Sequence, residues 1–364
     1  MTTRIVPPDD PYPYNAQQQK NLRNPMLRQP VLWVALFTLL LSIRHTALGT
    51  AVPQREEAVS PAAAPAQTPA TVGGVRVDDQ IVLISSRPVG CSCDPDTLMS
   101  GLKCQRCVVS AESCRHHWDD VDLLEVLQEN NPAVRTVFFV HGNQISAGQD
   151  KQQGLTVYRR MMRCADANRP IRFIIFSWPS AKISGPLRDI RVKAARTRPV
   201  GCQLAWVLDQ IPGDVPLGLI GYSFGARVVT GALHLLGGGN LGGLTLEKRA
   251  HPDRAPVRVV LIAAASNANW LSPGRYHGQA MTQIDKMLSI NNRSDIAMRW
   301  YSLSTRNGSP QAMGLCGPTC LGPQRQKVHN RDVSRYVGSS HDEYCYLSVP
   351  GVSCQLWNYT TWAE

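Results

Sequence analysis

The chain has 364 residues, of which 43% are hydrophobic and 18% are charged, so it can bury a core and is not a wholly disordered chain. Lys and Arg number 38 against 27 for Asp and Glu, which gives a net charge of +11. No basic stripe with interleaved aromatic residues accompanies this excess, and this argues against nucleic-acid binding.

The first 51 residues have the layout of a signal peptide. Arg28 precedes an uncharged apolar run at 31–43, and small residues follow at 46–51. The run is shorter than the roughly 20 residues that cross a bilayer, so we expect cleavage and export. An uncleaved membrane anchor is the alternative. Translation from Met26 would give a leader of ordinary length, which makes Met26 a second candidate start.

A linker and one domain follow. Residues 52–75 are rich in Ala, Pro and Thr, which is typical of a flexible linker. We expect a single domain from about residue 76 to residue 364, since no internal repeat divides it.

All eleven cysteines belong to this domain, and five of them fall in the segment 91–114, called here the cysteine-rich segment. In an oxidising compartment most cysteines should pair, although an odd number leaves at least one without a partner in the chain. We expect the cysteine-rich segment to be a loop held by disulfides. A zinc-binding interaction module that includes His116 and His117 is the alternative.

Beyond residue 78, short apolar runs alternate with segments of helical spacing. Continuous apolar strands between helices predict an α/β fold with a parallel sheet covered on both faces. The stretch 267–283, between two strands, is either a lid or a helix. We expect strands at 78–86, 136–142, 171–179, 216–223, 257–266, 285–292 and 326–333, and helices at 118–130, 150–166, 186–210 and 224–238.

The sequence Gly221-Tyr222-Ser223-Phe224-Gly225 connects a buried strand to an amphipathic helix. Glycines at both flanks allow the two backbones to approach closely, and the turn holds the serine hydroxyl above the sheet. The helix N-terminus behind it would stabilise a developing negative charge. This context predicts that Ser223 is a nucleophile. The plainer interpretation is a serine that caps an ordinary helix.

A serine nucleophile needs a histidine that accepts its proton and a carboxylate that orients the histidine. His341 is our candidate, because it lies in a loop of small residues after the last predicted strand. His329 is the alternative, although it would lie within that strand.

Asp295 is the candidate carboxylate. It falls between the serine and the histidine in chain order, at the carboxyl end of a predicted strand. Asp285 begins the same strand at the wrong end, and Asp332 and Asp342 are too close to the histidine loop. Asp295 could instead serve only to complement the dipole of the helix that follows.

Acyl transfer also needs backbone N–H groups that face the developing oxyanion. Phe224 should supply one, and Asn143 or Gln144, after the predicted strand at 136–142, should supply the other. An ordinary strand-to-helix loop is the alternative there.

Three aromatic side chains lie at the same predicted edge of the sheet. His141, Tyr222 and Trp178 either line an apolar substrate pocket or simply pack.

The motifs VFFVHGN, FSWPS, GYSFGAR, NNRSD and SSHDEY together resemble the α/β-hydrolase superfamily, and within it a group of bacterial α/β hydrolases of unknown function. The resemblance covers about residues 134–345. It implies a mostly parallel central sheet with helices on both faces, Ser223 as nucleophile, His341 as base and Asp295 as acid. It also implies cleavage of esters, amides or thioesters without a cofactor or metal.

Two features depart from well-known lipases, namely the cysteine-rich segment and a Cys316–Cys320 loop, and they leave the substrate open because such insertions shape pockets. We expect an exported serine hydrolase that cleaves a small-molecule or lipid ester. The alternative is a noncatalytic binding or cell-envelope module on the same scaffold. The sequence contains no Walker loop, HExxH motif or dinucleotide fingerprint.

Overall fold

The computed structural model describes residues 71–110, 115–166, 168–304 and 310–363. The predicted signal peptide, most of the predicted linker and Cys114 lie outside these residues. Two short antiparallel strands, β1 (Thr71–Val72) and β2 (Val75–Arg76), come first.

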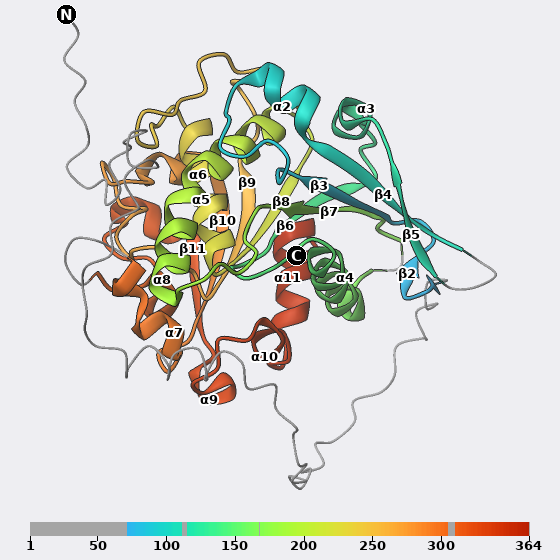
Figure 1. The fold of residues 1–364 in the computed structure, drawn as a ribbon. Helices are drawn as coiled ribbons and strands as arrows, with labels where there is room; N and C mark the ends of the chain where they lie inside the picture. Colours follow the sequence, from blue (N-terminus) through green and yellow to red (C-terminus); the bar gives the residue numbers. More distant parts are fainter. Residues whose placement is uncertain (1–70, 111–114, 167, 305–309, 364) are drawn as a thin grey trace, which may run out of the picture.

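Within the described residues, the main sheet has nine strands in the order β11-β10-β9-β8-β6-β7-β3-β4-β5 (Figure 1). Strands β3 and β6 to β11 pair in parallel, and β4 and β5 continue the sheet as an antiparallel hairpin. The bounds are β3 Gln80–Ser85, β4 Lys103–Val109, β5 His116–Asp120, β6 Arg135–Val140, β7 Ile171–Ser177, β8 Leu217–Tyr222, β9 Val257–Ile262, β10 Ile284–Asn291 and β11 Val328–Asp332.

Helices cover both faces of the sheet. Helices α5 and α6 pack on one face, and α4, α10 and α11 pack on the other (Figure 1). No helix in the described part of the chain combines the length and the apolar character that a membrane span requires. The α-helices are α2 Pro95–Gly101, α3 Leu123–Gln128, α4 Gln149–Met161, α5 Pro186–Asp209, α6 Phe224–Leu236, α7 Ile296–Arg299, α8 Met313–Cys316, α9 Ser334–Val337, α10 Glu343–Leu347 and α11 Val352–Thr361. Short 3₁₀ helices are η2 Met162–Cys164, η3 Gly278–Thr282, η4 Tyr301–Ser304 and η5 Gly322–Lys327.

The central strands are apolar throughout because each one serves two cores. In β6, Phe138 and Val140 join the core beneath α5 and α6, whereas Val137 and Phe139 join the core beneath α4 and α11. Successive side chains of a strand point to opposite faces, so a strand with helices on both sides has no polar face. The predicted α/β architecture with a mostly parallel sheet is confirmed.

The strand order changes direction at β6. Strand β7 follows β6 in the sequence and lies on one side of it, whereas β8, the next strand, lies on the other side. The connections that leave β6 and β8 therefore diverge from each other at the carboxyl ends of these strands. In open parallel sheets this is the position where ligands bind, and it is where the predicted site residues of β6 and β8 lie.

The segment before β6 differs from the sequence prediction. The predicted helix at 118–130 is shorter, because its first residues end β5, where Trp118 pairs with Cys107 of β4. Asp122 then caps α3 by accepting a hydrogen bond of 2.8 Å from the N–H of Glu125.

The cysteine-rich segment is also more regular than the predicted loop. Asp94 caps helix α2 through a bond of 2.8 Å from the N–H of Thr97, and Pro95 occupies the first turn, where a missing N–H costs nothing. Strand β4 follows and pairs with β3.

One disulfide, Cys164–Cys354, joins η2 to α11. The expectation that most cysteines pair is wrong for this structure, since the remaining cysteines of the described residues are thiols, at positions 91, 93, 104, 107, 202, 316, 320 and 345. Cys104 and Cys107 show one reason: they belong to the same strand but contact the cores on opposite faces. In the described ranges no three His, Cys, Asp or Glu side chains are placed to hold a metal ion.

Candidate active site

Ser223 lies between β8 and α6 in a backbone conformation that a non-glycine residue rarely adopts. Its φ is +53° and its ψ is −118°, and such strain persists only where the surroundings impose it. A Cβ at Gly225 would lie 2.0 Å from the carbonyl oxygen of Val140, and one at Gly221 would lie 2.6 Å from Ala226 Cα. The two glycines therefore allow β6, β8 and α6 to meet closely enough to form this turn.

The three side chains predicted to act together lie in one hydrogen-bonded chain. His341 Nε2 is 3.0 Å from Ser223 Oγ, and His341 Nδ1 is 2.6 Å from Asp295 Oδ2. Ser223 is 5% exposed and the His341 side chain 16% exposed, whereas Asp295 is fully buried. The alternative histidine, His329, lies in β11 and is exposed to solvent.

Asp295 fulfils both of the roles considered from the sequence. Its Oδ1 accepts a bond of 3.0 Å from the N–H of Met298 and so caps α7, while its Oδ2 accepts from His341. Oδ2 also accepts a bond of 2.5 Å from the buried Tyr346 hydroxyl. These three donors compensate a buried carboxylate that, among the described residues, has no Lys or Arg ion pair.

The loops that carry the acid and the histidine are bonded to each other. Asn292 Nδ2 donates to the carbonyl oxygen of Gly338 at 2.8 Å. The N–H of Ile296 donates to the carbonyl oxygen of Ser339 at 3.2 Å. These bonds fix the separation of Asp295 and His341 although the two residues are far apart in sequence.

Two tyrosines support this arrangement, and only one of them was singled out from the sequence. The Tyr222 ring stacks on the His341 imidazole with centroids 5.5 Å apart, and its hydroxyl donates to the His341 carbonyl oxygen. Tyr346, the one not singled out, bonds to Asp295 instead, and burial raises the pKa of its hydroxyl. Its only signal in the sequence was an aromatic residue in the helix that follows the histidine loop.

Glu343 begins α10 two residues after the histidine. It is buried, and its Oε2 accepts a bond of 2.5 Å from Gln153 Nε2 of α4. Burial raises the pKa of this carboxyl to about 8, because removal from water disfavours the charged form. At neutral pH the Glu343 carboxyl is therefore mostly protonated.

The turn after β6 narrows the choice of oxyanion donors. Gln144 has φ +61°, and its N–H already donates to the Ser180 carbonyl oxygen at 2.8 Å. Of the two residues predicted there, Asn143 is thus the better candidate. Its side chain is anchored, since Nδ2 donates to Asp189 Oδ2 of α5 at 2.8 Å. Phe224 begins α6, where the first N–H groups have no acceptor within the helix.

His141 and Trp178 do not present a pocket surface, because both side chains are fully buried. Their rings stack 5.7 Å apart, and Trp178 Nε1 donates to the His141 carbonyl oxygen at 2.8 Å. His141 Nε2 accepts from the N–H of Trp178, and burial lowers the pKa of the imidazole to about 4. Of the two roles considered from the sequence, the geometry supports packing, through which this pair holds the turn that carries Asn143.

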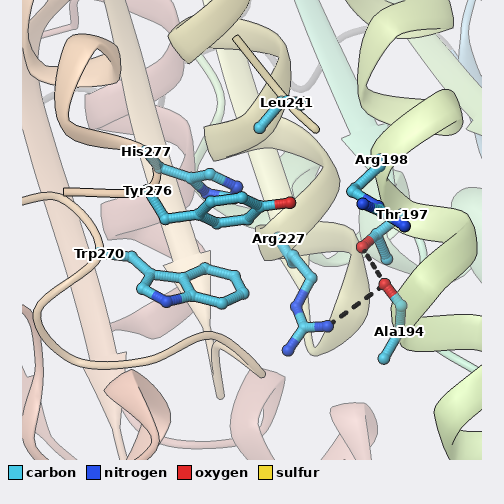
Figure 2. A pocket seen from close by; sticks show the side chains of 8 residues that line it. All are labelled: Ala194, Thr197, Arg198, Arg227, Leu241, Trp270, Tyr276 and His277. Atoms are coloured by element: carbon cyan, nitrogen blue, oxygen red, sulfur yellow. Dashed lines mark hydrogen bonds between the residues drawn. The ribbon is translucent and has the colours of Figure 1, made fainter. Parts of the chain in front are cut away.

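Arg227 lies in α6, one helical turn after Ser223, and its guanidinium bonds to the backbone of two segments that pack around the nucleophile turn. Figure 2 shows its guanidinium between Trp270 and the Ala194 carbonyl of α5, to which it donates at 3.3 Å. Arg227 Nε donates to the carbonyl oxygen of Ala265 at 2.9 Å. The N–H of Ala265 in turn donates to the carbonyl oxygen of Ser223 at 3.1 Å. The guanidinium thus ties α5 and the segment after β9 to the nucleophile turn.

Two cavities flank this region without including the three bonded side chains. The one in Figure 2 has a volume of about 10 Å³, room for about one water molecule. Its walls include Trp270, Tyr276 and His277 from the stretch 267–283, whose buried aromatic residues pack against α6 rather than forming a free lid. The second has a volume of about 340 Å³ and is lined by Arg293, Arg299, Gln311, Leu315 and Cys316.

The chain has an α/β fold with a mostly parallel sheet and a Ser–His–Asp cluster at the carboxyl ends of its strands. No protein-family model matches it, and a search of curated proteins finds no relative.

Proposed function

We propose that the protein is an exported serine hydrolase with an α/β-hydrolase fold, which cleaves a carboxylic ester through an acyl-enzyme on Ser223. The observation that carries the proposal is the unbroken hydrogen-bonded chain from Ser223 Oγ through His341 to Asp295. Its position at the point where the strand order reverses adds support.

In the proposed reaction His341 Nε2 takes the proton of Ser223 Oγ as the oxygen attacks the ester carbonyl carbon. The Asp295 carboxylate accepts a hydrogen bond from Nδ1–H of the resulting imidazolium and stabilises its positive charge. His341 then gives the proton to the departing alcohol, and an acyl group remains on Ser223. A water molecule, deprotonated by His341, attacks the acyl carbon; His341 then returns this proton to Ser223 Oγ as the acid is released.

The tetrahedral intermediates carry a negative oxygen, which the N–H groups of Phe224 and Asn143 would stabilise. Both groups belong to backbone fixed before any substrate arrives: Phe224 by the turn at Ser223, and Asn143 by its bond to Asp189. Donors that need not reorganise during the reaction are the most effective source of such stabilisation.

The test is the substitution Ser223→Ala, with activity measured on p-nitrophenyl esters of graded acyl length and labelling by a fluorophosphonate probe. The wild type should label and hydrolyse, with a preferred chain length, and the variant should do neither. Ser348→Ala changes an exposed serine at the end of α10 and should leave both readouts unchanged. A folded wild type that neither labels nor hydrolyses would favour a noncatalytic binding module.

A further inference from the structure

Outside the candidate active site, two thiols far apart in sequence meet at the boundary between the cysteine-rich segment and α5. Cys93 Sγ lies 3.6 Å from the carbonyl oxygen of Pro199, one turn before Cys202 in α5, and the Cys202 side chain is close enough to raise the pKa of the Cys93 thiol. Cys202 is almost fully buried, and Cys93 is partly exposed.

The backbone around both thiols is fixed. Gln203, next to Cys202, donates through Nε2 to the carbonyl oxygens of Gly90 and Ser92 at 3.1 and 3.0 Å. On the other side of Cys93, Asp94 is held as the cap of α2. The pair is therefore presented by two rigid elements rather than by a mobile loop.

We propose that Cys93 and Cys202 form a second structural disulfide in the exported protein. The Cys164–Cys354 bond in the same chain fits an oxidising compartment. A Cys93–Cys202 bond would close a loop of about a hundred residues, a length at which a cross-link strongly restricts the unfolded chain. It would attach the segment between β3 and β4 covalently to α5, which that segment already contacts through Gln203 and through Cys93 itself.

The chemistry is a thiol–disulfide exchange with a protein or glutathione disulfide as the oxidant. The Cys93 thiolate attacks one sulfur of that disulfide, forms a mixed disulfide and releases one thiolate. The Cys202 thiolate then attacks Cys93 Sγ and displaces the second. In total, the two electrons and two protons of the cysteine thiols pass to the oxidant, which leaves as two thiols. The neighbouring Cys202 side chain and burial raise the pKa of the Cys93 thiol, so we expect the exchange before the pair is buried during folding.

The test uses the full chain secreted through an oxidising compartment. Free thiols are blocked with N-ethylmaleimide in denaturant without reduction, and the tryptic peptides are identified by mass spectrometry, with the Cys164–Cys354 link as the internal standard. We expect a linked pair containing Cys93 and Cys202, two hydrogens lighter than the sum of its peptides. The link should persist in Cys91→Ser, whose cysteine shares the peptide of Cys93, and disappear in Cys93→Ser.

Thermal unfolding provides a second readout. The double variant C93A/C202A should melt about 5–10 °C below the wild type without reductant, and the gap should close when both are reduced. N-ethylmaleimide on both cysteines of wild-type protein that carries the Cys164–Cys354 link would overturn the proposal. So would a melting gap that reductant leaves unchanged, since the loss would then come from packing.

Discussion

The two ends of the sheet differ in how they are covered. At the parallel end, β6 and β8 to β10 are almost entirely buried, and polar side chains gather where these strands end. At the hairpin end, β4 and β5 run antiparallel and expose His117, Asp119 and Asp120. A side chain can be placed to a fraction of an ångström only where packing fixes the backbone on every side, and that condition holds for the buried strands β6 and β8 to β10 but not for β4 and β5.

The comparison predicts that a change of one atom at the parallel end costs far more activity than the loss of a whole side chain at the hairpin end. Asp295→Asn is the largest effect we expect, a fall in kcat of about 10⁴-fold, because an amide NH₂ cannot accept from His341 Nδ1 and the imidazole then takes the wrong tautomer. Steady-state hydrolysis of a p-nitrophenyl ester measures the effect.

Its control is Asp285→Asn, near the start of β10, whereas Asp295 follows the end of that strand; the Asp285 carboxylate lies 3.1 Å from Arg258 Nε. The kcat of the control variant should stay within about twofold of the wild-type value, since a partly exposed ion pair contributes little to the stability of the fold. Equal losses in the two variants would mean that Asp295 acts only as a helix cap.

A second prediction concerns how the parallel end responds to pH. The pKa of Glu343 is about 8 in the folded protein and about 4.3 in an unfolded chain. The folded state therefore holds the extra proton, and its contribution to stability is complete below pH 4 and is lost as pH rises toward 8. Glu343→Gln removes this titration. Between pH 5 and pH 9 the free energy of unfolding of the variant should therefore rise by a few kcal/mol relative to that of the wild type.

Urea unfolding at a series of pH values measures that gain. Glu125→Gln, an exposed change on α3, should leave the pH dependence as it is in the wild type. If the curves of Glu343→Gln and the wild type ran parallel from pH 5 to pH 9, Glu343 would titrate as an ordinary exposed carboxyl.

The smallest effect is expected at the hairpin end. Asp122→Ala removes the cap of α3, which follows β5, and should lower the free energy of unfolding by about 1 kcal/mol while kcat stays unchanged. Asp119→Ala, on β5 itself, removes an exposed carboxylate that caps no helix. This variant should lower the free energy of unfolding by less than Asp122→Ala does. A loss of activity in Asp122→Ala would show that the two ends of the sheet are coupled.

The same contrast explains what could be predicted from the sequence. At the parallel end, local pattern was enough to locate the strands and to select Ser223, Asp295 and His341, because each follows a strand and parallel strands bring their ends together. The structure places these three within hydrogen-bonding distance; their catalytic role stays a proposal.

Features that depend on contacts between distant segments could not be predicted. Trp118 was assigned to a helix, since nothing local shows that it pairs with Cys107. The bonds of Tyr346 to Asp295 and of Gln144 to Ser180 depend on how loops close in space. The buried stacking of His141 on Trp178 likewise arises only when β6 and β7 lie side by side.

The position of His341 in the chain has a consequence for biosynthesis. This residue and α11, which the Cys164–Cys354 bond fastens to η2, are both added to the growing polypeptide after every strand of the main sheet. A nascent chain that has already placed Ser223 at its turn still lacks the proton acceptor and the hydroxyl of Tyr346. Under the proposed function, hydrolysis would therefore begin only when the last helices dock, and a partly synthesised protein would be inert toward cellular esters.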